Sequence, residues 1–278
     1  MNPSSKSKFI KIALGILILG WTLFPVYWML TLSVRSQEDL NSGFSLVPRS
    51  FSLDNFINLF SQKHFATALF NSCIVTFTAL TLSLVIGLSC SYILARPRFN
   101  FIYRRFMIFW VLLVRILPPI AFAIPLFIMM TSAGIGSTRI PIILCHILAL
   151  TPFIIWFMLA FFANLPKEVE ESALIDGATE LQLFTKIVLP QVLPGIAAVG
   201  ILSFMTSWNE YLYGVIFVQS SSQFTIPLAL ATMNSEQELT QWGAIAAGGL
   251  VSLVPIICFV FFAQNFLLAG LSNGAVKE

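Results

Sequence analysis

The sequence predicts an all-α polytopic membrane protein with six transmembrane helices. Charged residues make up only 10% of the 278 residues, and hydrophobic residues make up 58%. A soluble domain carries about 25% charged residues, and a chain with so few would expose large apolar patches to water. Several long stretches also lack any Asp, Glu, Lys or Arg, and a helix needs about 20 apolar residues to cross a bilayer. The predicted spans are 11–33, 67–95, 106–131, 141–163, 192–218 and 244–268.

The basic residues predict how these spans are oriented, because Lys and Arg are enriched in cytoplasmic loops. Ten of the 15 basic residues lie on one side of the membrane and four on the other, with Arg115 inside the third span. This excess places both termini in the cytoplasm, which agrees with an even number of spans. The ten are Lys6, Lys8, Lys11, Arg96, Arg98, Arg104, Arg105, Lys167, Lys186 and Lys277, and the four are Arg35, Arg49, Lys63 and Arg139.

The chain is predicted to have three parts. Residues 1–34 have the basic start and apolar core of a signal peptide, but the apolar run is too long and no small-residue cleavage site follows it. We therefore expect an uncleaved anchor helix there. The other parts are an extracytoplasmic loop at 35–66, with a helix start near 52–55, and a core of five helices at 67–278 that includes a cytoplasmic loop at 164–191 and a C-terminal tail at 269–278.

The cytoplasmic loop is predicted to contain two short helices. Pro166 suits a first helical turn, and the acidic residues after it suit the positive end of a helix dipole. Gly177 tolerates the left-handed conformation that commonly ends a helix. Thr179 and Gln182 have the spacing of a capping box that starts the second helix. That helix is predicted to have one apolar face, made by Leu181, Phe184, Ile187 and Val188.

This loop has two alternative interpretations, adhesion to lipid headgroups and docking onto a protein. Helices that lie in the membrane interface prefer Lys and Arg on their polar face. The loop instead has five carboxylates and two lysines. This acidity favours a protein partner.

The motif in the loop points to a family. Glu171-Ser172-Ala173, Asp176-Gly177, Ile187 and Leu189-Pro190 resemble the EAA motif of ABC importer permeases, with Ser172 in place of the second alanine. The resemblance implies that these residues couple the permease to an ATP-binding subunit. It also implies the fold of a type I importer permease.

Other segments resemble the carbohydrate permeases of this family, of the maltose and trehalose type, and specifically the smaller of two paired subunits. They are Phe44–Phe56, Ser207–Tyr211, Thr225–Leu228 and Gly270–Lys277. The resemblance implies a multi-pass protein of the cell inner membrane that imports a sugar or glycoside by alternating access. It implies four kinds of partner: a second permease subunit in a heterodimer, two ATP-binding subunits, an extracytoplasmic solute-binding protein and membrane lipid. In the tail, the residues implied to contact the ATP-binding subunit are Gly270, Ser272, Gly274 and Lys277.

Two groups of residues are candidates for the transport pathway or its gate. Glu210 lies within the predicted fifth span, where an ionisable group is a functional candidate by default, and Trp208 and Asn209 suit the apolar face and hydroxyls of a sugar. The alternative is that Glu210 has a structural partner or reaches water. Arg115 precedes Pro118, which must break the third helix, and broken helices often line transporter cavities. We expect Arg115 to be buried rather than to extend to the cytoplasmic side.

Other classes of function are less well supported. The segment Gly270–Gly274 fits the nucleophile elbow of hydrolases, but that elbow needs a preceding strand and a catalytic histidine and acid. His146 and Cys145 are two adjacent potential ligands without a third, so we interpret both as packing residues and expect no metal site. We expect no cofactor, no P-loop for ATP and no nucleic-acid partner. A secondary transporter driven by an ion gradient remains the alternative, although it would need several carboxylates in its spans and this chain offers Glu210.

Overall fold

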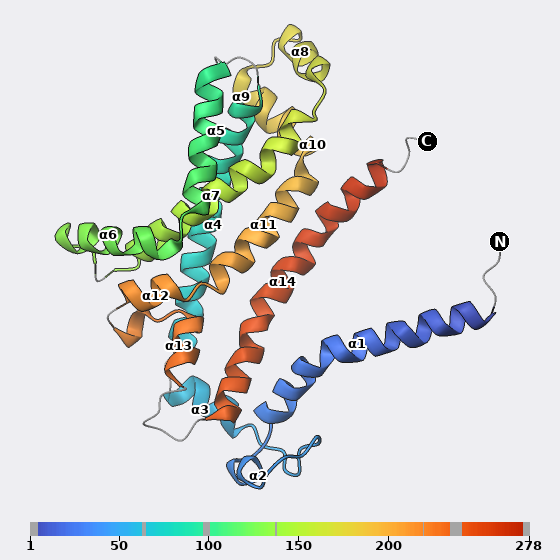
Figure 1. Cartoon of the computed structure of the whole chain (residues 1–278), viewed down its shortest axis with the longest axis vertical. Coiled ribbons are helices and arrows are strands. Elements are labelled where there is room, and N and C mark those ends of the chain that lie inside the picture. Colours follow the sequence, from blue (N-terminus) through green and yellow to red (C-terminus); the bar gives the residue numbers. More distant parts are fainter. Residues whose placement is uncertain are drawn as a thin grey trace. The chain divides into compact units, whose positions relative to one another are not determined.

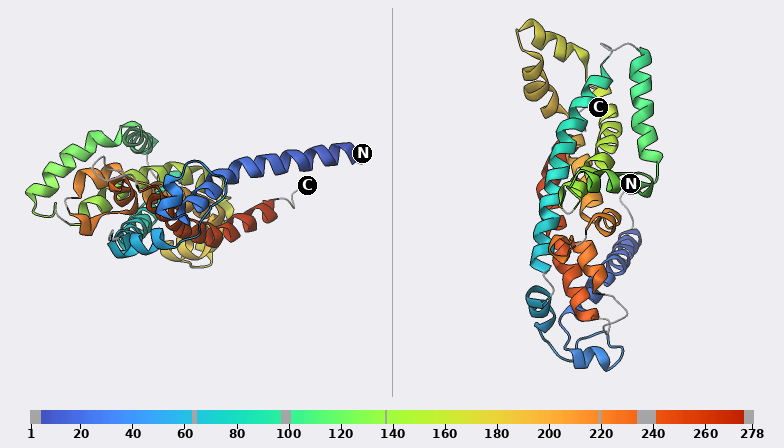
Figure 2. Two further views of the ribbon diagram at one scale, coloured as in Figure 1. Left: turned by 90° about the horizontal axis from the view of Figure 1, so that it is seen from below. Right: turned by 90° about the vertical axis from the view of Figure 1, so that its left-hand side faces the viewer.

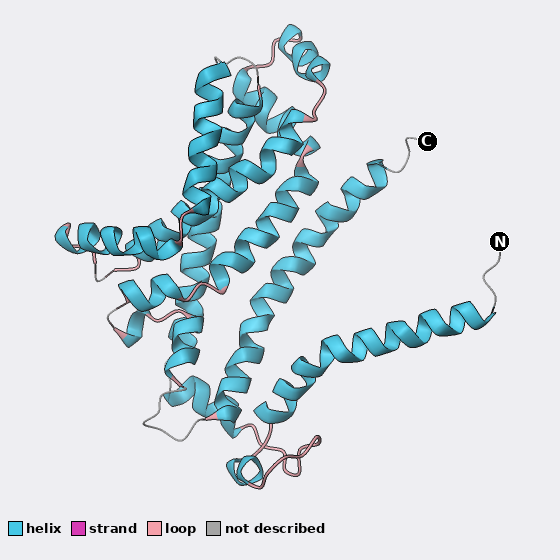
Figure 3. Ribbon diagram, viewed as in Figure 1, coloured by secondary structure: helices cyan, strands magenta, loops and turns pink. Residues whose placement is uncertain are grey.

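A computed structural model describes residues 5–62, 65–96, 101–136, 138–218, 220–233 and 241–274. Within these residues the chain is built from helices and contains no strand (Figure 3). The chain forms two compact units that are not consecutive in sequence. The first combines residues 1–66 with 229–254, and the second combines residues 67–228 with 255–278.

The first unit begins with a long apolar helix, α1 (Ser5–Ser33). Residues 8–27 of this helix are all exposed, as expected for a helix that is surrounded by lipid. Two short helices follow, α2 (Gln37–Asn41) and α3 (Asp54–Gln62). The end of α13 (Ile226–Thr232) and the start of α14 (Trp242–Gly274) complete this unit.

The loop between α1 and α3 is organised by Asp39. Its carboxylate accepts hydrogen bonds from the backbone N–H groups of Arg49 (2.8 Å) and Ser50 (3.2 Å), and it lies 4.0 Å from the Arg35 side chain. Burial opposes ionisation of Asp39, but the two N–H donors and the two arginines hold the pKa of its carboxyl below the ordinary value. The helix predicted near the end of this loop begins at Asp54.

The second unit is arranged around α7 (Ile140–Ala163), which is buried on several sides. It contacts α5 (Phe101–Ile116), α6 (Pro119–Ser132), α11 (Leu193–Trp208) and α12 (Leu212–Phe217). The unit also contains most of α4 (Phe65–Ala95), the 3-10 turn Ser221–Gln223 and the second half of α14 (Figure 1).

Four helices are each long and apolar enough to cross a membrane, namely α1, α4, α7 and α14. They confirm the predicted first, second, fourth and sixth spans. Two bent pairs pass the same test, α5 with α6 at an angle of 92° and the segment 180–191 with α11 at an angle of 78°. The described residues therefore accommodate six spans when each bent pair counts as one.

The third span was predicted to be locally unwound by its paired prolines, and this is confirmed. Helix α5 ends at Ile116 and α6 begins at Pro119, nearly at a right angle to it (Figures 1 and 2). Pro118 occupies the N-cap position with an extended backbone. Proline lacks the backbone N–H that would continue α5, whereas its fixed φ suits Pro119 to the first turn of α6.

The fifth span was predicted as one helix over 192–218, and this is wrong. Helix α11 ends at Trp208, and α12 starts again at Leu212. The N–H of Tyr213 donates to the Glu210 carboxylate (2.8 Å) and not to a preceding carbonyl. This bond satisfies a donor at the start of α12 and stabilises the break.

Close approaches of α7 to its neighbours depend on glycine. A β-carbon at Gly87 of α4 would lie 2.6 Å from Ile154, and one at Gly195 of α11 would lie 2.6 Å from the ring of Phe161. Small residues allow helices in membranes to pack closely. Around these contacts a core of buried residues joins α4, α7, α11 and the loop over 164–191, including Leu88, Ile154, Phe162, Leu183 and Val199.

The glycine contact gives a matched pair of variants on α11. We expect Gly195→Ala to lower the unfolding midpoint of the purified protein, because the added methyl group would overlap the Phe161 ring at a cost of about 1–3 kcal/mol. Gly200→Ala is the control, since nothing lies within 4 Å of a β-carbon there. Thermal denaturation of both variants in detergent tests this, and equal midpoints would contradict the packing.

Candidate functional site

The predicted two-helix loop is present at one end of the second unit. Helix α8 (Lys167–Ile175) is followed by Gly177, whose φ of 82° lies in the left-handed region that favours glycine. The N–H of Gly177 donates to the carbonyl of Leu174 (3.1 Å), and the N–H of Ala178 donates to that of Ala173 (3.0 Å). This pair of bonds is the Schellman motif, and it confirms Gly177 as the helix stop.

The second helix of the loop starts with the predicted capping box. The N–H of Gln182 donates to the Thr179 hydroxyl (3.3 Å), and the Gln182 side chain accepts from the Thr179 N–H (3.0 Å). Helix α9 (Glu180–Gln182) is short and continues into a π-helix, Leu183–Val188, then α10 (Leu189–Gln191).

The π-helix changes which side chains face the core. Its wider turn places residues five apart on one face, so Leu183 and Val188 are both fully buried. Leu181, predicted to share one apolar face with Phe184, Ile187 and Val188, is 71% exposed, whereas Val188 is buried. The prediction is therefore wrong for Leu181, because it assumed α-helical spacing. Ile187 and Leu189 of the motif are partly buried against the core.

A buried ion pair fastens α8 to the end of α4. The Glu170 carboxylate pairs with the Arg96 guanidinium, whose Nε donates to Glu170 Oε2 at 3.0 Å. The Tyr92 hydroxyl donates to the same oxygen (3.0 Å), and Arg96 also donates to the Phe162 carbonyl (2.7 Å). Arg96 and Glu170 are both 7% exposed. From the sequence, Arg96 was predicted to be a loop charge and Glu170 a charge near a helix N-terminus, and this pair was not predicted.

The loop therefore has an attached side and an exposed side. Ala173 is buried and lies one turn from Glu170, so it faces the spans. Glu171, Ser172, Asp176, Gly177 and Pro190 of the motif are exposed. Two large apolar side chains are exposed beside them, Ile175 at 86% and Leu181 at 71%. We call the surface formed by Glu171, Ser172, Ile175, Asp176, Gly177 and Leu181 the docking face.

A second group of polar side chains is buried between α4, α7 and α11. The His146 ring contacts the Ser207 hydroxyl through Nδ1 (2.6 Å), and Ser207 donates to the Thr76 hydroxyl (3.3 Å). The other ring nitrogen, Nε2, lies 3.5 Å from a carboxylate oxygen of Glu210. His146 is 3% exposed and was interpreted from the sequence as a packing residue. Its burial agrees with that interpretation, and the structure adds polar contacts from His146 to Ser207 and Glu210.

The neighbours of Glu210 in the sequence are placed differently. Trp208 is 2% exposed and its ring stacks on Phe204, which stacks in turn on Phe259 (4.3 Å between centroids). Asn209 is exposed and donates to the carbonyl of Met205 (2.9 Å). Trp208 therefore belongs to an aromatic stack between α11 and α14.

Arg115 and Pro118 lie away from this group. Arg115 was expected to be buried, but it is exposed, and its guanidinium lies over the rings of Phe153 (4.9 Å) and Trp156 (4.3 Å). These rings are at least seven residues from His146 along α7, which corresponds to about 10 Å of helix. Two aromatic faces accommodate the cation without burying it, which the sequence position did not reveal. Pro118 is also exposed.

The tail residues Gly270, Ser272 and Gly274 lie on the last turns of α14, and Lys277 lies outside the described residues. Helix continues through the whole Gly270–Gly274 segment. It therefore does not form the strand, turn and helix of a nucleophile elbow.

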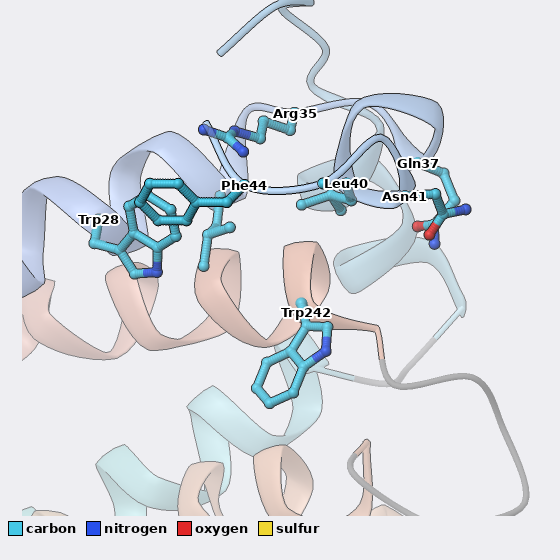
Figure 4. Close-up of a pocket in the computed structure, with 9 residues that line it drawn as sticks. Trp28, Arg35, Gln37, Leu40, Asn41, Phe44 and Trp242 are labelled. Carbon is cyan, nitrogen blue, oxygen red and sulfur yellow. The ribbon is translucent and has the colours of Figure 1, made fainter. Parts of the chain in front are cut away.

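The first unit has a pocket of about 230 Å³ lined by aromatic and polar side chains (Figure 4). Such a lining is typical of carbohydrate sites, but its members are already engaged. The rings of Trp28 and Phe44 stack on each other (5.3 Å), and Arg35 lies over Trp28. Gln37 and Asn41 point away from this stack in Figure 4. We assign no function to this pocket.

Comparison with known proteins gives one family. The chain matches, over residues 83–269, the family model described as "Binding-protein-dependent transport system inner membrane component". It is 33% identical to the trehalose transport system permease protein SugB of Mycobacterium tuberculosis, over 95% of this chain and 96% of the relative.

Two other curated relatives match this chain at a similar level of sequence identity. The diacetylchitobiose uptake system permease protein NgcG of Streptomyces coelicolor is 34% identical, over 99% of this chain and 91% of the relative. The arabinooligosaccharides transport system permease protein AraQ of Halalkalibacterium halodurans is 34% identical, over 92% and 91%.

The fold also resembles solved structures. A chain in the crystal structure of a bacterial ABC transporter involved in the import of the acidic polysaccharide alginate superposes with a TM-score of 0.79. It is 20% identical, and the match covers 94% of this chain and 98% of that one. A structure of the bacterial alginate ABC transporter with alginate pentasaccharide-bound periplasmic protein gives a TM-score of 0.69 at 19% identity. These structural similarities show that this protein has the same fold as one of the chains in these transporters.

Proposed function

Since this chain belongs to the family of binding-protein-dependent transport system inner membrane components, and is therefore a multi-pass permease, we propose that the docking face couples it to an ATP-binding subunit. The protein is a transport component of an ABC importer, and its curated relatives are sugar permeases. In our proposal the cytoplasmic loop passes the closing movement of two ATP-binding subunits to the spans. Movement of the helices attached to the loop then opens the transport pathway alternately to each side of the membrane.

The proposed cargo is a disaccharide or short oligosaccharide. The relatives named above carry trehalose, diacetylchitobiose and arabinooligosaccharides in their names. Each of these is made of two or more sugar units. The proposed assembly contains a second permease subunit, two ATP-binding subunits and an extracytoplasmic solute-binding protein, with both termini of this chain in the cytoplasm. ATP hydrolysis belongs to the ATP-binding subunits.

The chemistry of the docking face supports a protein partner. Ile175 and Leu181 expose large apolar side chains on the same loop as the exposed carboxylates of Glu171 and Asp176. An apolar centre with a charged rim is typical of protein interfaces. The partner surface should therefore offer an apolar cleft edged by basic side chains.

The attachment of the loop is equally important to the proposal. Arg96 and Glu170 fix α8 to α4, and the chain then runs through Val192, where it bends by 78° into α11. A push on the docking face is therefore transmitted to rigid helices. We propose that Ala173, Ile187 and Leu189 of the motif serve this attachment, and that the tail residues Gly270, Ser272, Gly274 and Lys277 make a second contact with the ATP-binding subunit.

A double substitution tests the docking face. We expect Ile175→Ser with Leu181→Ser to weaken binding of the ATP-binding subunit about a hundredfold or more, because burying each side chain contributes about 1.5–3 kcal/mol. Affinity is measured between the purified permease complex in nanodiscs and the isolated ATP-binding subunit. Sugar uptake should fall in parallel.

The control is Leu17→Ser on α1, which removes an apolar side chain of similar exposure, 70%, outside the loop. It should leave the affinity for the ATP-binding subunit unchanged. If the double variant binds as tightly as the Leu17→Ser control, the docking face has been assigned to the wrong surface.

A further inference from the structure

An apolar cavity of about 420 Å³ lies between α4 and α5 in the second unit. Ile155 of α7 forms its floor and is 6% exposed, whereas Ile93 of α4 and Met107 of α5 are 44% and 57% exposed. The side of the cavity between α4 and α5 is therefore open, and a spanning helix faces lipid there. The full lining is Cys90, Ile93, Leu94, Tyr103, Arg104, Met107, Val111 and Ile155.

The cavity begins at the end of the spans that carries the docking face. Leu94 is in the last turn of α4, directly before Arg96, which bonds to α8. Arg104 is in the first turn of α5, at the same end of the unit (Figure 1). Val111 lies seven residues beyond Arg104, about 10 Å further along α5. The cavity thus runs from the helix ends into the apolar part of the spans.

The end of the cavity at the helix termini is basic. Arg104 belongs to the lining, and Arg105 is exposed in the next position of α5. Neither α4 nor α5 contains an acidic residue, and the charge of Arg96 is balanced by Glu170. The rest of the lining is apolar or uncharged at neutral pH. A basic pocket between membrane helices suits an anionic lipid headgroup.

We propose that this cavity binds a phospholipid with a negatively charged headgroup. One acyl chain lies in the cavity against Ile93, Met107 and Ile155, and the headgroup phosphate accepts hydrogen bonds from the Arg104 guanidinium. Arg104 suits this position because its apolar stem can line the cavity while its cation reaches the headgroups. Tyr103 has the amphipathic ring that is enriched at the same depth of a membrane. The site requires a bilayer and no ATP-binding subunit, so it is independent of the proposed function.

The distribution of charge favours a lipid over a helix of a partner subunit. A partner helix would have to carry a carboxylate opposite Arg104 at the end of its apolar stretch, and acidic residues are rare in transmembrane segments. Every anionic phospholipid carries its negative charge at that depth and its apolar surface below it. The cavity has the same order, with a basic end and an apolar length.

Photocrosslinking in the assembled transporter tests the site. The complex is reconstituted in phosphatidylcholine nanodiscs with a trace of a probe lipid, which has a photoreactive group in its acyl chain and a phosphatidylglycerol or a phosphatidylcholine headgroup. We expect the phosphatidylglycerol probe to label residues 90–94 and 103–111 about fivefold more than the phosphatidylcholine probe, or better. Arg104→Gln should lower that ratio about fivefold, because one arginine near an anionic headgroup contributes a preference of this size.

Three further variants separate the headgroup from the shape of the cavity. Arg104→Lys keeps the charge and should keep most of the ratio. Arg115→Gln removes an arginine at the other end of α5, outside the lining, and should leave the ratio unchanged. Cys90→Phe fills the cavity and should remove labelling of 103–111 by both probes. In detergent, added phosphatidylglycerol should raise the unfolding midpoint of the wild type and of Arg104→Lys, because a ligand of the folded state stabilises it.

Equal labelling by the two probes, or a ratio that Arg104→Gln leaves unchanged, would overturn the proposal of an anionic headgroup. Labelling of the isolated chain that disappears in the assembled transporter would overturn the lipid site altogether, because the second permease would then cover the cavity. None of these measurements depends on sugar uptake, so a failure of this proposal is distinct from a failure of the proposed function.

Discussion

Gly177→Pro should abolish uptake while leaving membrane insertion intact. Proline requires a φ near −65°, whereas Gly177 has a φ of 82°. It also lacks the N–H that Gly177 donates to the Leu174 carbonyl, and it disfavours a ψ near 5° at the preceding Asp176 (φ −74°, ψ 5°). The turn between α8 and α9 must therefore rearrange, and the docking face with it.

A graded series separates the turn from general damage. Gly177→Asn should retain most uptake, because asparagine tolerates the left-handed region, whereas Gly177→Ala should show an intermediate loss from a strain of about 1–2 kcal/mol. Uptake is measured with insertion confirmed by membrane fractionation. Wild-type uptake by the proline variant would show that the turn is not needed for coupling.

The second large effect concerns the buried ion pair. We expect Glu170→Ala to destabilise the protein by about 3–5 kcal/mol, because it leaves the Arg96 guanidinium buried without its counter-charge. Helix α8 should detach from α4, so the ATP-binding subunit should also be lost during purification. Thermal denaturation in detergent and recovery of the complex measure the two consequences.

A combined replacement provides the internal test. Arg96→Met with Glu170→Met should recover much of the stability, because an apolar pair of similar volume removes the uncompensated charge. Glu168→Ala is the matched control, an exposed carboxylate in the first turn of the same helix, and should change stability by less than about 0.5 kcal/mol. Equal stability of Glu170→Ala and Glu168→Ala would mean that the pair does not hold the loop.

The sequence was sufficient where the structure depends on local backbone chemistry. Gly177 as a helix stop, the capping box of Thr179 and Gln182, and the break at Pro118 were all predicted and are confirmed. Each depends on the conformations that one or two residues allow. The membrane class and the carbohydrate permease family were also predictable, and the family match and relatives confirm them.

The sequence was insufficient where distant segments meet. Glu170 is separated from Arg96 by 74 positions, and His146 from Ser207 by 61. Charge counts and hydrophobic periodicity assign such residues to loops or packing surfaces, because neither pattern identifies the partner of a side chain. The exposure of Leu181 was missed for another reason, because a π-helix shifts the face by one residue and no residue type marks its start.

In our proposal this chain is a permease whose cytoplasmic loop receives work from separate ATP-binding subunits. The most direct test of this proposal is uptake of a labelled disaccharide into proteoliposomes that contain the chain with its second permease, in the presence of the loaded solute-binding protein. We predict ATP-dependent uptake that requires the ATP-binding subunits and is lost in Ile175→Ser with Leu181→Ser. Uptake by the chain without ATP-binding subunits, driven by an ion gradient, would contradict the proposal.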